Sequence, residues 1–371
     1  MGFAIDAAAA QSRIDRCREL MAQQGVDALL LSVGHDLPYL VGYHAMPLER
    51  LTMLVVPRDG TPTLVIPGLE APRVVEMPGV FAMRPWGETE DPVAIVASLT
   101  KGMSTAAVGD QMWSRFLVDL IVQSPALRFT RASFIVGELR MRKDSTEIGA
   151  LTAAGNAIDR VADQLHSGQI PLIGRTEAQV SADLSARIIA EGHEKVNFAI
   201  VAAGENAASP HHHPGDRVIR AGEIVLCDFG GTMNGYCSDT TRCVFTGEPT
   251  PEIAEAYAVL KAAEAAAARA GVVGTSCESV DHAARSIIDS AGFGEYFVHR
   301  TGHGIGMEEH EDPYMVAGNT LAIEAGFAFS VEPGIYVPGK WGMRLEDIVV
   351  ATASGPVAMN QSSHDLVSVV A

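Results

Sequence analysis

Basic residues are scarce in this chain of 371 residues. It holds 27 Lys and Arg against 45 Asp and Glu, so its formal net charge is −18. A surface this acidic repels the phosphates of nucleic acids and of anionic lipids, and the few basic residues are scattered along the sequence. The composition therefore argues against nucleic acids and membrane surfaces as partners.

Cysteines and long hydrophobic runs are scarce as well. The five cysteines form no CxxC pair, which argues against a disulfide framework and a structural zinc site and favours buried, reduced thiols. The N-terminus lacks the basic and apolar segments of a secretory signal, and no apolar run reaches the roughly 18 residues of a membrane helix. These absences predict a soluble, cytoplasmic protein.

The length exceeds that of one typical domain, and the first part of the chain alternates helix and strand signals. No GxGxxG or phosphate-binding loop occurs in it. Residues 1–138 are therefore expected to form a small α/β domain. Its predicted elements are helix 10–24, strand 28–31, a hairpin of strands 51–57 and 63–67, helix 92–101, strand 106–109 and helix 111–123.

Charge density rises at 139–143, and a second domain is expected at 142–371. Its first helix is predicted to begin with Asp144 as the cap and Glu147 three residues later. The pattern then predicts helices 144–168 and 176–192, strands within 196–245, helices 252–270 and 276–291, and strands within 296–371. This order predicts one α+β unit used twice, as an internal pseudo-repeat of pattern rather than of residue identity.

Two pairs of carboxylates stand out in the second domain. Asp228 and Asp239 flank a segment with three glycines, and Glu332 and Glu346 flank another Gly- and Pro-rich turn. A hairpin over each segment would place the two acids of a pair side by side at a strand end. Two of the acids follow apolar runs, where unpaired charges are rare. Because carboxylates held this close need protonation or a cation, the four together predict a cation site.

His303 completes this set. It lies between glycines in the segment TGHGIG, which leaves its imidazole unobstructed. One imidazole nitrogen with several carboxylate oxygens suits Mn(II), Co(II) or a catalytic Zn(II) better than a thiolate-type structural zinc site. Such sets commonly hold two ions, which share a bridging hydroxide and stabilise the transition state of a hydrolysis.

Other histidines allow more than one interpretation. In the run His211-His212-His213, an exposed polar loop explains His212 and His213 as well as a functional role does. His310 by itself is typical of a loop, but near a metal set it can donate a proton or a hydrogen bond to a substrate. Asp239 taken alone is equally well explained as a turn acid.

The segments VLCDFGGTMNGYCSDTTR, HRTGHGIGMEEHEDP, FSVEPGIY and MRLED, in this order, resemble the metal-dependent "pita-bread" peptidases of family M24. The family includes methionine aminopeptidase, Xaa-Pro aminopeptidase and prolidase. Residues 36–42 (DLPYLVG) resemble, more weakly, the creatinase/prolidase N-terminal domain. The resemblance implies an α+β pita-bread fold with an internal pseudo-two-fold repeat over 142–371, preceded by a smaller α/β domain. It lies closest to the bacterial, proline-specific branch.

The resemblance also implies roles for individual residues. The metal ligands would be Asp228, Asp239, His303, Glu332 and Glu346, with Asp239 and Glu346 shared between two ions. Glu332 resembles the general base as well. No ligand is replaced, which argues against a relative that keeps only the fold.

Further residues of the family's site have counterparts here. His211 and His310 resemble catalytic histidines that contact the substrate, and Arg344 resembles an arginine that binds the product-side carboxylate. His299 and Tyr336 would stand behind these residues and support them.

The implied function is hydrolysis of the Xaa-Pro bond of dipeptides or short peptides by a hydroxide that bridges two divalent ions. Manganese is the expected metal, with cobalt or zinc as alternatives, and the resemblance favours a cytoplasmic homodimer. A scissile bond to proline has no N–H, so an apolar slot can accept the ring. Two alternatives remain open: an Xaa-Pro aminopeptidase that acts on longer peptides, and a lyase or hydrolase of a small non-peptide substrate.

Overall fold

A computed structural model describes residues 5–369, and these divide into two compact units, residues 5–140 and 141–369. None of the helices in the described range combines the length and the apolar character needed to cross a bilayer. All five cysteines are buried and free.

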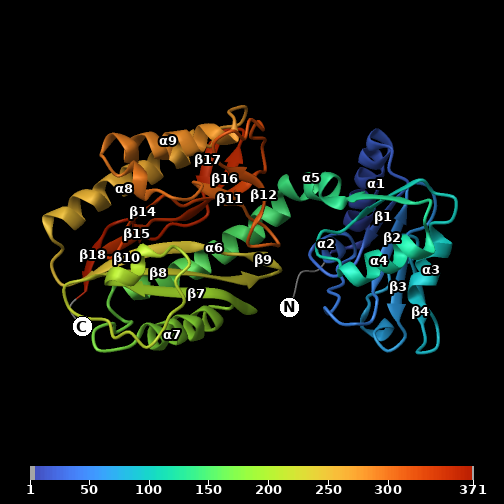
Figure 1. Ribbon diagram of the computed structural model, residues 1–371, viewed down its shortest axis with the longest axis horizontal. Coiled ribbons are helices and arrows are strands. Elements are labelled where there is room, and N and C mark those ends of the chain that lie inside the picture. The colour runs from blue at the N-terminus through green and yellow to red at the C-terminus, as the bar shows by residue number, and fades with distance from the viewer. Residues whose placement is uncertain (1–4, 370–371) are drawn as a thin grey trace. The chain divides into compact units, whose positions relative to one another are not determined.

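The first unit is a six-stranded mixed sheet flanked by helices (Figure 1). The strands lie in the order β4-β3-β2-β1-β5-β6, and the predicted hairpin is present as the antiparallel pair β2–β3. The predicted helices and strands of this unit are confirmed, with small shifts at their ends. The elements are α1 (Ala7–Gln24), β1 (Ala28–Leu31), α2 (Asp36–Val41), β2 (Met53–Pro57), β3 (Thr63–Pro67), η1 (Ala71–Arg73), β4 (Ala82–Trp86), α3 (Pro92–Leu99), β5 (Thr105–Val108), α4 (Ser114–Gln123), β6 (Arg128–Arg131), η2 (Ala132–Phe134) and α5 (Val136–Met141).

The second unit consists of two sheets, a short hairpin and four long helices. In Figure 1, helices α8 and α9 lie on the opposite side of the strands from α7. The elements are α6 (Ser145–His166), α7 (Glu177–Ala190), β7 (Lys195–Ala203), η3 (Gly204–Ala208), β8 (Ile224–Met233), β9 (Tyr236–Cys237), β10 (Thr240–Thr246), α8 (Pro251–Ala270), α9 (Cys277–Ser290), η4 (Gly294–Tyr296), β11 (Gly302–Gly304), β12 (Glu311–Met315), β13 (Ala328–Val331), β14 (Gly334–Val337), β15 (Trp341–Arg344), β16 (Asp347–Thr352), β17 (Gly355–Ala358) and β18 (Val367–Val369).

The predicted start of α6 is confirmed. The side chain of Asp144 accepts hydrogen bonds from the backbone N–H groups of Thr146 and Glu147, and the Glu147 side chain accepts one from the backbone of Asp144. This reciprocal capping box satisfies donors that the first turn of a helix leaves unpaired. Thr176 and Gln179 form the same motif at the start of α7.

The pseudo-repeat is visible in the sheets. One sheet contains the order β10-β8-β7 and the other the order β16-β13-β11, with neighbouring strands antiparallel in both. Each set follows a pair of helices, α6 and α7 in the first half and α8 and α9 in the second. The predicted α+β unit, used twice, is therefore confirmed.

Backbone contacts repeat between the halves as well. The N–H of Gly174 bonds to Ile219 O at 2.9 Å, and the N–H of Gly274 bonds to Ile323 O at 2.8 Å. Each contact ties the segment before the second helix of its half to the segment before the central strand, β8 or β13. The two sheets meet where the Glu346 N–H donates to Thr241 O at 3.2 Å. This junction adjoins the predicted cation site.

Candidate metal centre

The candidate ligands meet in a cavity of about 570 Å³ in the second unit. The four carboxylates and His303 line it, and so do His211, His299, His310 and Arg344. Of the residues to which the family resemblance gives a role, Tyr336 is absent from the lining and lies behind it. The remaining lining residues are Phe198, Ile200, Pro210, Arg300 and Glu309.

The pseudo-repeat explains why the four carboxylates meet. Asp228 is the fifth residue counted from the start of β8. Glu332 is likewise the fifth residue counted from the start of β13, although that strand ends one residue before it. Asp239 and Glu346 immediately precede β10 and β16. Each half therefore presents two acids from equivalent places in equivalent strands, and the junction of the sheets brings the two pairs together.

Two details differ from the sequence-based expectation. Asp228 lies within β8 rather than at a strand end, because β8 continues to Met233 before it turns. The segment between Glu332 and Glu346 is not a single turn but a hairpin of its own, formed by β14 and β15. Val331 pairs with Asp347, so the two glutamates still face each other across the β13–β16 register.

His303 is held in the form that a metal ligand needs. Its Nδ1 lies 3.0 Å from the carbonyl oxygen of Gly304, an acceptor, so Nδ1 carries the proton and Nε2 presents a lone pair. Nε2 lies 3.3 Å from Glu332 Oε1 and 3.7 Å from Asp239 Oδ2. Burial, reinforced by the neighbouring His310, lowers the pKa of His303 well below its usual range. The ring is therefore neutral at pH 7.

Burial and mutual repulsion disfavour the charged forms of these carboxylates when no cation is bound. Burial raises the pKa of Asp239 well above its usual range, and the charges of Glu346 and Asp228 raise it further. Burial raises the pKa of Glu346 in the same way, followed by the effects of Glu332 and Asp228. Burial also raises the pKa of Glu332 to about 7.

The donor atoms fit a divalent cation. Asp239, His303 and Glu346 each offer one ligand atom, and these atoms lie within 4.8 Å of one another. The buried Oδ1 of Asp228 has no hydrogen-bond partner among residues 5–369. Buried polar atoms are rarely left unpaired, and an oxygen-rich set with one imidazole suits Mn(II), Co(II) or Zn(II).

Arg344 approaches the ligand set from behind. Its Nη2 lies 2.5 Å from Asp228 Oδ2, and its Nε donates to Thr241 Oγ1 at 3.0 Å. The Arg344 side chain is 4% exposed. It therefore neutralises and orients Asp228, a contact that the sequence did not indicate. Binding of a product carboxylate by Arg344 stays a prediction.

Tyr336 and His299 extend this contact into a chain. Arg344 Nη1 donates to the Tyr336 hydroxyl at 2.8 Å, and that hydroxyl lies 2.9 Å from His299 Nε2. Burial, followed by the charge of Arg344, lowers the pKa of His299 to about 4. A neutral His299 accepts from the tyrosine through Nε2 only if its proton is on Nδ1, which lies 2.7 Å from Arg300 O.

His310 and His211 approach the cavity from two different loops. The His310 ring stands perpendicular to the His303 ring, with centroids 4.0 Å apart. Burial, followed by the charge of Arg300, lowers the pKa of His310. His211 is exposed and reaches the cavity from the loop after η3. Both rings are thus placed to meet a substrate in the cavity.

The interpretation of His212 as an exposed loop residue is wrong. His212 is half-buried, and its Nε2 lies 2.8 Å from a carboxylate oxygen of Glu177, which is completely buried. The exposed-loop interpretation holds for His213, which is exposed.

Sequence reasoning missed several lining residues. Phe198 and Ile200 lie on β7 and give the cavity an apolar wall, while Arg300 and Glu309 add charge to it. The alternation Phe198, Ile200 in a strand pattern is a signal that both side chains share one face, but nothing in the sequence shows which face meets the cavity.

A second buried cluster lies behind the ligand set. His364 Nε2 lies 2.7 Å from Asp347 Oδ2, and His364 Nδ1 lies 3.4 Å from Glu264 Oε2. Arg242 pairs with the other oxygen of Asp347 at 2.7 Å and donates to Glu346 O at 2.7 Å. Because Arg242 already neutralises Asp347, we interpret this cluster as an ion-pair network, in which Arg242 holds the backbone carbonyl of Glu346.

The stability conferred by His364 is expected to depend on pH. Burial lowers the pKa of His364, but the hydrogen bond and charge of Asp347, with Glu264, outweigh this and raise it. Its stabilisation is therefore fully present below the unfolded-state pKa near 6.5 and is lost as pH rises through the folded-state value. Burial raises the pKa of Glu264 to about 7, so ionisation of Glu264 also lowers the stability of the fold as pH rises. Melting curves from pH 5.5 to 9 should show the wild type's advantage over H364Q shrinking as pH rises, and a constant advantage would contradict this.

The fold and the site together define a pita-bread metallopeptidase preceded by a creatinase/prolidase-type domain. The chain belongs to metallopeptidase family M24, whose model matches residues 149–353, and the creatinase/prolidase N-terminal domain model matches residues 13–142. The predicted family and fold class are confirmed. As a member of this family the chain is an enzyme, a hydrolase, and depends on divalent metal.

Similar proteins span nearly the whole chain. The probable dipeptidase PepE of Mycobacterium tuberculosis is 44% identical over 356 residues, which cover 94% of this chain and 93% of that protein. Dipeptidase PepE from Mycobacterium ulcerans superposes with a TM-score of 0.93 at 43% identity, covering 99% of this chain and 100% of the other. A prolidase from Thermococcus sibiricus gives a TM-score of 0.92 at 33% identity, with 99% and 100% covered. An Xaa-Pro dipeptidase from Bacillus anthracis gives 0.89 at 27% identity, with 97% and 100% covered.

Proposed function

We propose that this chain hydrolyses the Xaa-Pro bond of dipeptides with two divalent ions bound by Asp228, Asp239, His303, Glu332 and Glu346. The convergence of these five side chains in one cavity carries the proposal. The likeness to a prolidase and to an Xaa-Pro dipeptidase supports the substrate class. We further propose that residues 1–138 and 142–371 act as separate domains of a cytoplasmic homodimer, with manganese as the metal.

Each side chain has a chemical task in this reaction. The four carboxylates and His303 would hold the two ions, and the bound ions would supply an activated water and polarise the scissile carbonyl. Glu332 takes the proton of the attacking water and returns it to the proline nitrogen as the C–N bond breaks. His310 donates a hydrogen bond to the carbonyl oxygen, where negative charge develops.

The substrate is held by groups around the cavity. His211 contacts the peptide at the mouth of the cavity, and Arg344 attracts its carboxylate. Phe198 and Ile200 provide the apolar wall for the proline ring, which brings no N–H to the scissile bond and therefore leaves no donor unpaired there. This wall favours proline over a polar residue at the second position.

The proposal predicts cleavage of Ala-Pro and Leu-Pro by protein loaded with Mn(II) or Co(II). Chelation should abolish this cleavage, because the water is no longer activated. Xaa-Pro-Yaa tripeptides in parallel reactions separate the two peptidase branches, with free Xaa measured as product. Cleavage of tripeptides alone would make the chain an aminopeptidase. Cleavage of neither class by protein that contains two ions would refute a peptidase and favour a non-peptide substrate.

A further inference from the structure

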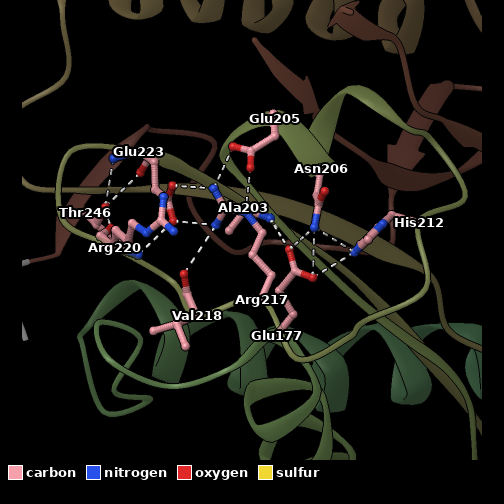
Figure 2. Close-up of polar contacts among 10 residues, drawn as sticks. All are labelled: Glu177, Ala203, Glu205, Asn206, His212, Arg217, Val218, Arg220, Glu223 and Thr246. Carbon is pink, nitrogen blue, oxygen red and sulfur yellow. Dashed lines mark hydrogen bonds and ion pairs between the residues drawn. The ribbon is translucent and has the colours of Figure 1, made fainter. Parts of the chain in front are cut away.

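Glu177 is a buried carboxylate that the chemistry proposed above does not use. It is the first residue of α7 and is completely buried. Its carboxylate oxygens accept several hydrogen bonds from protein donors (Figure 2). The donors are the backbone N–H of Ala203 at 2.9 Å, Asn206 Nδ2 at 3.0 Å and His212 Nε2 at 2.8 Å. A buried charge is tolerated when it is hydrogen-bonded in this way.

These donors all belong to one segment, residues 203–215. The segment leaves β7, passes through η3 and carries His211 to the cavity. Glu177 also accepts from the Gly215 N–H at 3.4 Å, so its carboxylate holds the segment on both sides of His211. His212, the chain neighbour of His211, makes the shortest of these contacts. The position of the Glu177 carboxylate therefore sets where His211 can stand.

The other half of the pseudo-repeat shows that the fold does not need this charge. Cys277 begins α9 as Glu177 begins α7, and it is also completely buried. The backbone N–H groups match too, since Glu177 donates to Arg217 O at 3.0 Å and Cys277 to Leu321 O at 2.9 Å. A small thiol thus satisfies the same place in the fold, which leaves the carboxylate of Glu177 to serve the segment that it binds.

A second clamp lies beside the first and offers a control. The guanidinium of Arg217 pairs with Glu205, at 2.7 Å, and with Glu223, at 2.8 Å (Figure 2). The Glu205 side chain is 56% exposed, so its pair adds little. Loss of the Glu205 carboxylate leaves Arg217 bound to Glu223 and leaves the contacts of Glu177 in place.

We propose that Glu177 is a positioning residue, which fixes residues 203–215 through Asn206, His212 and two backbone N–H groups and thereby places His211 against the substrate. The kinetic part of this inference rests on the proposed function, while the structural part does not. Because all the partners of the carboxylate are donors, E177Q must turn an NH₂ group toward donors whichever way the amide is oriented. Misplacement of a substrate-contacting group by about 1 Å can cost about 100-fold in rate.

The kinetic test is a double-mutant cycle on an Xaa-Pro dipeptide. E177Q is expected to lower kcat/KM about 10- to 100-fold, whereas E205Q stays within about twofold of wild type. In an H211A background, E177Q should lower kcat/KM by less than about a further threefold, since the side chain that Glu177 positions is already absent. Multiplicative losses in the double variant would overturn the proposal, because a general loss of folding acts regardless of His211.

His212 provides a conservative rescue. H212A removes one donor to Glu177 and should lower kcat/KM several-fold, whereas the amide of H212Q can still donate to that carboxylate and should restore most of the loss. Equal losses in both variants would count against the proposal.

Hydrogen exchange provides a readout that needs no turnover. On metal-loaded protein, E177Q is expected to raise amide exchange in residues 203–215 at least about tenfold, with exchange in α8 and α9 unchanged, and E205Q to leave both unchanged. Exchange in 203–215 equal to wild type would overturn the proposal. If the wild type cleaves no peptide, the proposed function fails, and this exchange result alone decides whether Glu177 fixes the segment.

Discussion

Replacing Asp239 by alanine is expected to remove bound metal and peptide cleavage together. Asp239 is 4% exposed, and it offers a ligand atom within 4.8 Å of those of His303 and Glu346. Asp239 directly precedes β10, and Glu346 directly precedes β16 at the equivalent place of the other half. The substitution therefore removes one member of this symmetric pair. The other residues of the cavity act on a substrate only when the metal site supplies the activated water. Without Asp239, kcat/KM should therefore fall more than about 1000-fold.

The matched control is another buried acid of the second unit. Glu264 is 2% exposed and belongs to the cluster with His364, outside the cavity lining. E264Q should keep metal content by elemental analysis and cleavage of Leu-Pro within about threefold of wild type. Full activity in D239A, with wild-type metal content, would mean that the ligand assignment is wrong.

Replacing His310 by alanine is expected to separate catalysis from metal binding. The His310 ring stands perpendicular to His303 at 4.0 Å and lines the cavity, but it belongs to none of the positions that we assign as ligands. Loss of one hydrogen bond to a developing oxyanion typically costs about 100- to 1000-fold in kcat. H310A should therefore lose kcat on this scale while it binds metal as the wild type does.

The matched control is His213, an exposed histidine of the other histidine-bearing loop. H213A should keep both kcat and KM close to the wild-type values. Stopped assays with Leu-Pro, at metal concentrations that saturate each variant, give kcat and KM separately. A rise in KM with kcat unchanged would assign His310 to substrate binding alone. A loss of metal in H310A would contradict its separation from the ligand set.

Local signals made most of the fold predictable. The caps at Asp144 and Thr176 begin α6 and α7 where the sequence indicates, since capping depends on residues three positions apart. Asp228 and Glu332 were identifiable because each follows an apolar run that a free charge does not suit. The two acid pairs could be proposed as one site because the two halves share a pattern.

Contacts between distant segments were not predictable from the sequence. Arg344 pairs with Asp228 across 116 positions, and Glu177 binds His212 across 35. Neither pair has a spacing that identifies it, because each depends on which strands or loops the fold places together. The hairpin β14–β15 was missed for a different reason, since its proline and glycines are typical of a simple turn.

The pseudo-repeat illustrates the same division. The order of helices and strands predicted it, but some matching positions carry different residues, as Glu177 and Cys277 do. Backbone contacts, such as those of Gly174 and Gly274, show which positions correspond. The correspondence then separates what the fold needs, a small buried side chain, from what the site needs, a carboxylate.

Metal-dependent cleavage of an Xaa-Pro dipeptide tests the account most directly. Protein stripped with a chelator is titrated with Mn(II), and bound metal and the release of proline from Leu-Pro are measured on the same samples. The ligand set predicts no cleavage without metal and a rate that rises with binding and levels off at two ions per chain. Protein that binds two ions per chain and cleaves neither Leu-Pro nor an Xaa-Pro-Yaa tripeptide, or that cleaves equally well without metal, would contradict the account.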